Sequence, residues 1–513
     1  MKNSYQFFIQ QTAKTVFALA VLLVLGISVA YSQTTRYVTP VGAGTMDGSS
    51  WTNSSSDFPA IINASASGDA VWVAAGIYKP TKDPLNNASP TNPRDRTFYV
   101  KDGVQIYGGF AGNETLLTQR NIAANITTLS GDFNDDDVVT GTGATLSFTN
   151  NTENAYHVVA ALAPQIGGIG VTIDGFTIIG GNANNFTAIT VNGSYMPRGY
   201  GGGILTLYGT NTIRNNTLIA NLSNAGGGMA LLASTSICTN NTIINNAGSG
   251  IHTQDGLHTF TNNTVAGNTK SGMSITYCTS IITNNTIYNN VAASSGAKPA
   301  NPNNKQSNNA QFSTGTTAGG GIFLFYSNNT ITNNVLYNNS ADLGGAIYAN
   351  DGPNTIINNT FYANSATNGG GIFTQVGTNT LSNNIFWGNL KGSSTTIAGA
   401  DIANSATAPA TNNITYCLTQ QNSIYSTGTG IINNQNPLFV NAAGIDGADN
   451  THRTADDGLC LSCGSPAYNV GTAIGAPTTD IVNTTRPQFG TIDMGAYEKV
   501  DNCCGAKVGT WIN

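Results

Sequence analysis

The pair Asn-Asn recurs at a nearly constant spacing through the middle of the chain, and this repetition constrains the fold more than any other feature. The pairs begin at residues 215, 240, 262, 284, 333, 358 and 383. The spacing is 22 or 25 residues, except for one interval of 49 residues that contains a polar insertion over 291–318. A short, regular spacing of the same motif indicates that each repeat forms one structural unit, which stacks on its neighbours. The sequence therefore predicts a solenoid.

Apolar residues occupy fixed positions within each repeat, which assigns one side of every strand to the core. In the unit around Asn358 these residues are Ile347, Ile356 and Phe361. Each unit thus offers three short strands rich in Thr, Ile and Val, joined by small-residue turns. This pattern predicts a parallel β-solenoid with coils about 4.8 Å apart. A leucine-rich repeat is the alternative, but it needs a leucine skeleton and one Asn per unit, whereas these units carry three.

Asparagine at the repeat corners predicts ladders of amide hydrogen bonds along the stack. Asn tolerates the left-handed backbone conformation that corners require, and its amide can bond the equivalent amide in the next coil. A further Asn follows six positions after the start of each pair. The structural ladder is assigned to the first residue of each pair: Asn215, Asn240, Asn262, Asn284, Asn333, Asn358 and Asn383.

The N-terminus has the pattern of an export signal. Lys2 and Lys14 precede a short apolar run over 15–28, which small residues follow. No later apolar run is long enough for a membrane-spanning helix, so none is expected after signal removal. A short capping helix is expected over 57–64, with Ser56 as its N-cap, in a single elongated domain. The predicted segments are a signal peptide (1–32), a cap and irregular coils (33–182), regular repeats (183–390) with insertion loops at 183–199 and 291–318, and C-terminal coils with an acidic loop and a Cys-containing tail (391–513).

Charge is scarce in this chain, and that excludes several functions. Charged residues make up 9% of the sequence and the formal net charge is −6, so nucleic acid is not expected as a partner. Between residues 201 and 400 the only acidic residues are Asp255, Asp342 and Asp351, which are not paired on adjacent coils as glycan cleavage would require. We therefore expect no enzyme. The alternatives are a polysaccharide lyase or glycoside hydrolase with its site in the N-terminal coils, and a structural spacer that displays the insertion loops.

Two acidic loops have oxygen ligands at the short spacing that Ca²⁺ prefers. A structural Ca²⁺ is the one cofactor that these loops suggest, and the alternative for each loop is a water-exposed acidic turn. The candidate ligands are Asp132, Asn134 and Asp136 in the first loop, and Asp446, Asp449, Asp456 and Asp457 in the second.

Aromatic residues recur at two repeat positions whose strand parity predicts that they face outward. Such columns are candidates for a platform that binds sugar rings or a partner protein, and the alternative is self-stacking that stiffens the sheet. The two columns are Tyr288, Tyr337, Tyr362 and Trp387, and Phe323, Tyr348 and Phe373.

The cysteines divide into core and tail positions. Cys238 shares the interior slot of Ile213 and Phe260, so it is expected to fill the core. Cys460-Leu-Ser-Cys463 and Cys503-Cys504 lie near the C-terminus, where an oxidising compartment favours a disulfide between the two segments.

Several motifs resemble those of known surface proteins. Gly-Gly-Ala-Ile347 and Phe361-Tyr-Ala-Asn364 resemble the GGAI and FxxN repeats of chlamydial polymorphic outer membrane proteins. The opening from Tyr37 to Tyr78 is similar to bacterial right-handed β-helix surface proteins of the pectin lyase-like superfamily, and the ending Asp493-Met-Gly-Ala-Tyr-Glu498 resembles their choice-of-anchor region. The resemblance implies an all-β, right-handed parallel β-helix. It also implies a secreted or outer-membrane surface location and an adhesin that binds an extracellular glycan or surface protein.

Overall fold

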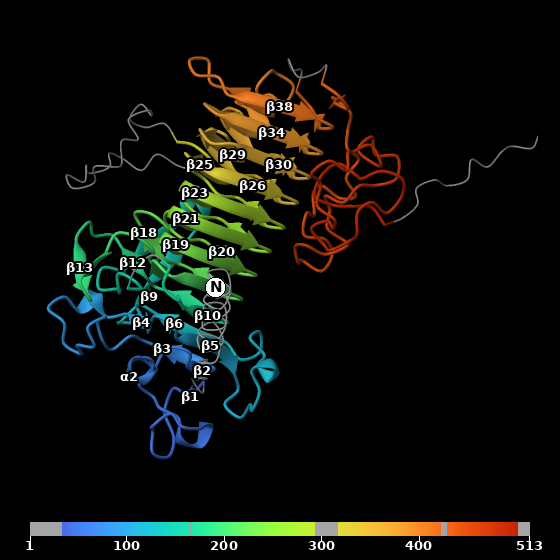
Figure 1. Ribbon diagram of the computed structural model, residues 1–513. Helices are drawn as coiled ribbons and strands as arrows, with labels where there is room; N and C mark the ends of the chain where they lie inside the picture. Colours follow the sequence, from blue (N-terminus) through green and yellow to red (C-terminus); the bar gives the residue numbers. More distant parts are fainter. Residues whose placement is uncertain (1–32, 165–166, 293–316, 422–427, 501–513) are drawn as a thin grey trace, which may run out of the picture. The chain divides into compact units, whose positions relative to one another are not determined.

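The computed structural model describes residues 33–164, 167–292, 317–421 and 428–500. The expected signal peptide, most of the 291–318 insertion, and Cys503 and Cys504 lie outside these residues. In the described part, the chain winds into coils that stack in parallel register along one direction, from β1 to β38 (Figure 1). The parallel β-helix architecture expected from the repeats is confirmed.

The largest sheet runs along the whole stack and contains 19 strands in the described residues. β19, β21 and β23 are long strands of 11 residues, whereas later coils divide the same path into two shorter strands. Its strands are β1 (Thr35–Val38), β2 (Ala70–Ala74), β4 (Phe98–Lys101), β5 (Gln105–Phe110), β9 (Val159–Leu162), β10 (Thr172–Asp174), β15 (Ile204–Leu207), β16 (Thr210–Arg214), β19 (Met229–Thr239), β21 (Ile251–Thr261), β23 (Met273–Thr283), β25 (Ile322–Phe325), β26 (Asn328–Thr332), β29 (Ile347–Asn350), β30 (Asn354–Ile357), β33 (Ile372–Thr374), β34 (Thr378–Ser382), β37 (Ile402–Asn404) and β38 (Thr411–Thr415).

A second parallel sheet of 12 described strands forms another side of the coils. Its strands are β3 (Gly76–Tyr78), β6 (Thr127–Ser130), β11 (Thr177–Ile179), β17 (Thr217–Ile219), β20 (Thr242–Ile244), β22 (Thr264–Ala266), β24 (Thr286–Tyr288), β27 (Val335–Tyr337), β31 (Thr360–Tyr362), β35 (Ile385–Trp387), β39 (Leu418–Thr419) and β40 (Ile432–Asn433). Short sheets complete the fold: β28 (Ser340–Leu343) with β32 (Ser365–Asn368) and β36 (Leu390–Lys391), β12 (Asn182–Ala183) with β18 (Leu222–Ser223), and the antiparallel hairpins β7 (Val138–Thr140) with β8 (Ser147–Thr149) and β13 (Ala188–Val191) with β14 (Ser194–Pro197).

The core consists of inward side chains that repeat in register from coil to coil. Ile347 pairs with Ile372, and Phe361 pairs with Phe386. The two phenylalanine rings stack at 4.5 Å with 4° between their planes, and all four side chains are fully buried. Burial of one such side chain stabilises the fold by about 1.5–3 kcal/mol. Cys238 lies in the same core, as expected.

The Asn-Asn pairs form the corners, but the continuous ladder lies one residue later than the sequence assignment. The first residue of each pair has a φ between 55° and 58°, the left-handed conformation that Asn tolerates. That turn directs the next side chain into the interior, where its Oδ1 accepts both the backbone N–H and the Nδ2 of the equivalent Asn in the preceding coil at 2.8–3.1 Å. The buried ladder residues are Asn216, Asn241, Asn263, Asn285, Asn334, Asn359 and Asn384. A parallel ladder at the third Asn of each unit comprises Asn221, Asn246, Asn268, Asn290, Asn339, Asn364 and Asn389.

A short helix closes the N-terminal end of the core. α2 (Phe58–Ala64) buries Phe58, Ile61 and Ile62, and the Phe58 ring packs 5.1 Å from that of Phe98. Its N-cap is Asp57, whose carboxylate accepts the backbone N–H of Ala60, so the assignment of the cap to Ser56 is wrong by one residue. Short 3-10 turns occur at Trp51–Asn53, Pro93–Asp95, Leu117–Gln119 and Gly143–Thr145.

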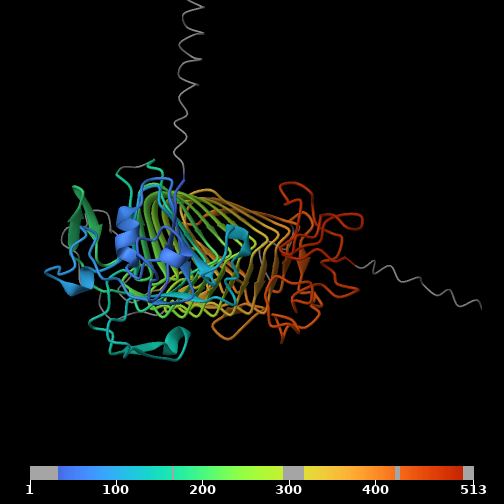
Figure 2. The same ribbon diagram turned by 90° about the horizontal axis from the view of Figure 1, so that it is seen from below.

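The chain after β40 does not continue the coils but lies beside the 12-stranded sheet (Figures 1 and 2). We call residues 435–500 the C-terminal segment. Three corner asparagines bind its backbone: the Nδ2 groups of Asn333, Asn358 and Asn383 donate to the carbonyls of residues 479, 493 and 472 at 2.7–3.0 Å. The corner residues of these coils therefore hold a lateral cover, and Asn383 Nδ2 also donates to Asn358 Oδ1 at 3.1 Å.

The interior also contains a histidine with no polar partner in the described structure. His258 is 3% exposed, and it lies in register between Ser236 and Ser280 of the adjacent coils. Neither of its ring nitrogens has a hydrogen-bond partner. Burial lowers the pKa of His258 to about 4, so the side chain is neutral over the physiological pH range.

His258 is expected to make the fold sensitive to acid. The unfolded chain takes up a proton near pH 6.5, and the folded chain takes it up only near pH 4. The stability that neutral His258 provides is complete above pH 6.5, and about 3 kcal/mol of it is lost as the pH falls to 4. The leucine in His258→Leu cannot take up a proton. The free energy of unfolding of this variant minus that of the wild type should therefore increase by about 3 kcal/mol between pH 7 and pH 4. Denaturant titrations at both values measure it, and a constant difference would contradict the assignment.

Candidate functional site

The first aromatic column is covered, which corrects the expectation of an outward platform. Tyr337 is 6% exposed and packs against Leu459, Ile481 and Tyr497 of the C-terminal segment. Its hydroxyl lies 3.2 Å from Nε2 of His452. Tyr288, Tyr362 and Trp387 are half-buried along the same interface. The parity argument was right about the side of the sheet, but a segment distant in sequence occupies that side.

The second aromatic column is a self-stacked row. Phe323 and Tyr348 stack at 5.3 Å, and Tyr348 and Phe373 stack at 5.9 Å, with planes within 6°. Tyr348 is fully buried and Phe373 is 5% exposed. These rings therefore offer little free area to a ligand, and the stacking alternative describes them better.

The second acidic loop does not gather its carboxylates around one point. Asp456 accepts the backbone N–H groups of Ala448 and Asp449, and Asp457 accepts the Tyr497 hydroxyl. No three of Asp446, Asp449, Asp456 and Asp457, all in the described part of the chain, lie within reach of one ion. The structure therefore does not bring these carboxylates together as the expected calcium site requires.

The first acidic loop does bring carboxylates together, although not the set expected. Asp132 and Asp136 meet Asp137 and Glu153, with one oxygen of each within 4.8 Å of all the others. The backbone N–H of Asn134 donates to Asp132 Oδ1 at 3.0 Å. Sequence spacing gave no signal for Glu153, which comes from beyond the β7–β8 hairpin.

The charged side chains of the N-terminal coils, where the enzyme alternative would place its site, are largely bonded within the fold. Asp174 is fully buried, and its carboxylate accepts Arg120, Arg214 and Asn215 at 2.7–2.9 Å. Arg94 donates to the carbonyls of Asn154 and residue 182. Both oxygens of Asp174 thus accept hydrogen bonds from side chains of the fold, two of them from arginines.

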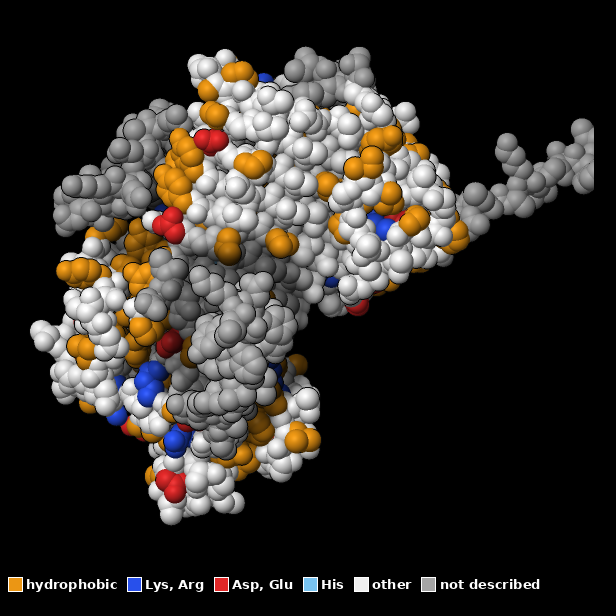
Figure 3. Space-filling view, viewed as in Figure 1, with side chains coloured by type: hydrophobic (Ala, Val, Ile, Leu, Met, Phe, Trp, Pro, Cys, Tyr) orange, Lys and Arg blue, Asp and Glu red, His pale blue; other side chains and the backbone are white. Residues whose placement is uncertain are grey.

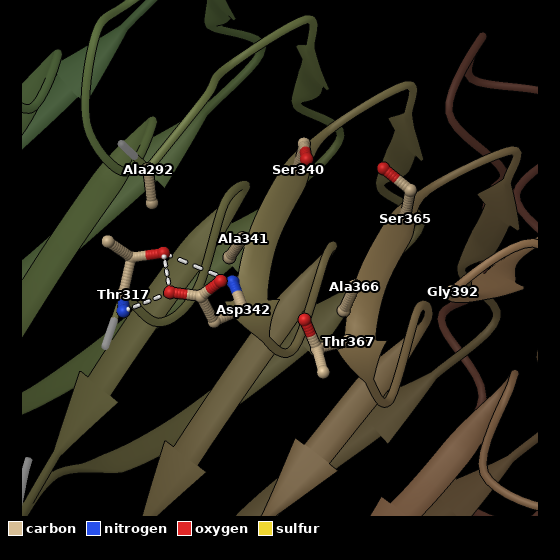
Figure 4. A pocket seen from close by; sticks show the side chains of 9 residues that line it. All are labelled: Ala292, Thr317, Ser340, Ala341, Asp342, Ser365, Ala366, Thr367 and Gly392. Carbon is tan, nitrogen blue, oxygen red and sulfur yellow. Dashed lines mark hydrogen bonds between the residues drawn. The ribbon is translucent and has the colours of Figure 1, made fainter. Parts of the chain in front are cut away.

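A hollow of about 470 Å³ lies over the sheet of β28, β32 and β36 (Figure 4). Among the described residues, the one charged residue in its lining is Asp342, which accepts the backbone N–H and hydroxyl of Thr317 at 2.7 and 2.9 Å. Small side chains form the rest of the lining: Ala292, Ser340, Ala341, Ser365, Ala366, Thr367 and Gly392. The part of the lining that the structure describes contains no pair of carboxylates for acid–base chemistry.

The 19-stranded sheet has a regular, uncharged, Thr-rich surface that the sequence analysis did not identify, and exposed Ile237, Leu257 and Ile281 also lie on it. Two outward columns cross eight coils in register, and five residues of each column are Thr. The alternation of Thr along single strands was a readable signal. We define the threonine face as these two columns: Thr210, Thr235, Leu257, Thr279, Asn328, Pro353, Thr378 and Thr411, and Thr212, Ile237, Thr259, Ile281, Thr330, Thr355, Thr380 and Asn413.

Every residue of the threonine face is exposed or half-buried, and none is charged. The space-filling view shows few charged side chains over the upper coils (Figure 3). Two aromatic residues border the first column: Tyr277 and Tyr326 are 39% and 47% exposed, and their rings stack at 5.6 Å. The face repeats at about 4.8 Å between coils and about 6.6 Å along each strand. It is a flat, neutral surface with exposed aromatic rings at its edge.

The fold defines the chain as an all-β protein of the right-handed parallel β-helix class. The family model described as "Right handed beta helix region" matches residues 167–292, which include β10 to β24. No curated protein is significantly similar to the chain in sequence. Among the described residues, no helix has the length and apolar character needed to cross a membrane.

Three solved structures resemble the chain at low sequence identity. Pectate lyase Pel9A is 14% identical with a TM-score of 0.43, and the match covers 92% of this chain and 98% of that one. The complex of XylC with xylose is 10% identical with a TM-score of 0.43, covering 91% and 99%. A family 28 exopolygalacturonase of Yersinia enterocolitica is 12% identical with a TM-score of 0.22, covering 79% and 67%.

Proposed function

We propose that this chain is a secreted or cell-surface adhesin that binds a neutral glycan chain through the threonine face and catalyses no reaction. The single observation that carries the proposal is the exposure of this uncharged face over eight coils. The signal-like N-terminal sequence supports export to the cell surface or outer membrane. In this proposal Tyr277 and Tyr326, at the edge of the face, provide the aromatic contact that strand parity predicted for the two aromatic columns.

The chemistry of the face suits a neutral sugar polymer better than a charged one. Threonine offers a methyl group and a hydroxyl, which match the C–H and O–H groups of sugars, and tyrosine rings give flat contact area. A face without charge provides no electrostatic attraction for acidic polysaccharides. The stacked coils hold these groups rigidly, which lowers the entropic cost of binding. A polymer can also make the same weak contact in several coils, so that avidity adds to affinity.

Thr330→Lys is expected to weaken glycan binding at least tenfold, which corresponds to about 1.4 kcal/mol. The lysine would place a long charged side chain in the middle of the face, where Thr330 is exposed on β26. Thr367→Lys is the matched control, because Thr367 is an exposed strand residue on a different sheet. Arrays of neutral and acidic polysaccharides measure binding, and thermal melting checks that both variants are folded.

A second pair of variants tests the aromatic edge. Tyr326→Asn removes the exposed ring but introduces a residue that tolerates the φ of 47° at this corner. This variant should remain folded and bind glycan more weakly. Tyr195→Asn removes a tyrosine that is 75% exposed on the β13–β14 hairpin, and it should not weaken binding. Binding unaffected by Thr330→Lys and Tyr326→Asn would refute the assignment of the face. Release of products from any polysaccharide by the wild type would refute the non-enzymatic role.

A further inference from the structure

Four carboxylates converge at the base of the β7–β8 hairpin. Asp132 follows β6, Asp136 and Asp137 lead into β7, and Glu153 follows β8. One oxygen of each lies within 4.8 Å of the others. Oxygen ligands of one Ca²⁺ lie about 2.3–2.6 Å from the ion, so two of them are at most about 5 Å apart. The group therefore has the dimensions of a calcium coordination sphere.

Buried oxygens without partners provide an independent sign that something is bound there. Asp137 Oδ1 and Glu153 Oε1 are shielded from solvent and accept no hydrogen bond. The side chain of Asn154 is 1% exposed, its Nδ2 donates to Asp137 Oδ2 at 2.7 Å, and its Oδ1 has no partner. Turning this amide over exchanges its oxygen and nitrogen, which would present the unpartnered Oδ1 to the carboxylates as a fifth ligand. Buried oxygens normally have a partner, so the two unpartnered carboxylate oxygens favour a cation at this place.

The cluster lacks a neutralising partner within the described protein. None of the salt bridges in this part of the chain reaches Asp132, Asp136, Asp137 or Glu153, and the adjacent Lys79 pairs with Asp135 at 2.6 Å instead. Four acidic groups this close favour a bound cation or proton sharing at neutral pH.

We propose that this cluster binds Ca²⁺ through Asp132, Asp136, Asp137, Glu153 and Asn154. Hard carboxylate and amide oxygens on two separate loops suit Ca²⁺, which accepts irregular geometry, better than Mg²⁺, which requires a near-ideal octahedron. The ion joins the two ends of the β7–β8 hairpin. At the hairpin tip, the hydroxyl of Thr142 bonds Asn245 at 2.6 Å and the N–H of Gly143 donates to the carbonyl of residue 267 at 3.0 Å. Calcium therefore holds the β7–β8 hairpin in its contact with the coils that contain β20 and β22.

Calorimetric titration of the chelator-treated full chain with CaCl₂ tests the proposal directly. We expect one saturable site in the wild type and a melting temperature that rises with Ca²⁺, because an ion that binds only the folded state stabilises it. Glu153→Gln and Asp137→Asn should lose both effects. Asp449→Asn, in the second acidic loop, is the matched control and should keep both.

Limited proteolysis of the wild type provides a readout that does not depend on variants folding. The hairpin over 138–149 should be cut several times faster in chelator than in Ca²⁺. Absence of Ca²⁺ binding by the wild type, with a melting temperature and hairpin cleavage that do not change, would overturn the proposal in favour of proton sharing. An equal response to Mg²⁺ at the same concentration would overturn the assignment to Ca²⁺. Retention of the site by both Glu153→Gln and Asp137→Asn would show that the ion binds elsewhere.

Discussion

Replacing Tyr337, Tyr362 and Trp387 together with Ser is expected to detach the C-terminal segment and to lower the free energy of unfolding by at least about 5 kcal/mol. Tyr337 is 6% exposed, Tyr362 meets Phe439 edge-to-face at 5.8 Å, and Trp387 packs in a cluster with Leu461 and Met494. The serines would remove most of the apolar contact between the 12-stranded sheet and its cover. Thermal melting and limited proteolysis within residues 435–500 measure the effect.

The sign of this result separates two roles for the aromatic column. Had the three rings been a ligand platform, their loss would leave the melting temperature unchanged. Because they form an internal interface, stability should fall while binding at the threonine face persists in the folded coils. Tyr195→Ser is the control for loss of an exposed ring, and its effect should stay within about 0.5 kcal/mol. A triple variant as stable as the wild type would contradict the interface.

Asn359→Ala is expected to cost about 3–6 kcal/mol, since it interrupts the buried ladder in the middle of the stack. Asn359 Oδ1 accepts both the backbone N–H and the Nδ2 of Asn334 at 2.9 and 3.0 Å. Its Nδ2 donates to the carbonyls of residues 331 and 357 and to Asn384 Oδ1. Alanine would leave these groups without partners in a region that water does not reach.

Denaturant titration followed by circular dichroism measures this loss. Asn413→Ala is the matched control, because Asn413 is an exposed Asn in a strand, and its effect should be within about 0.5 kcal/mol. Asn358→Ala acts differently: Asn358 binds the carbonyls of residues 493 and 495, so its loss should loosen the C-terminal segment first. If Asn359→Ala and Asn413→Ala had equal effects, the ladder would not be a main source of stability.

The candidate sites differ in how far the sequence could indicate them. Thr330 and its equivalents alternate with buried residues along single strands. This alternation is visible in the sequence, so the threonine face could have been predicted from it. The interior ladder was also accessible, because Asn359 follows a corner residue that turns the chain inward. Glu153 was not accessible, since its contact with Asp132 depends on the path of a 12-residue hairpin that no periodicity describes.

The sequence by itself determined the coils, their inward residues and the positions of their corners, because these follow from a short period that every unit repeats in register. Ile347 and Phe361 had to be buried once their repeat positions were known. Only the tertiary structure decided which outward surfaces stay free. The C-terminal segment covers Tyr337, although the column of Tyr337 has the same outward parity on the 12-stranded sheet as the open threonine face has on the 19-stranded sheet. Parity is a local property of a strand, whereas coverage depends on docking between segments that are distant in the sequence.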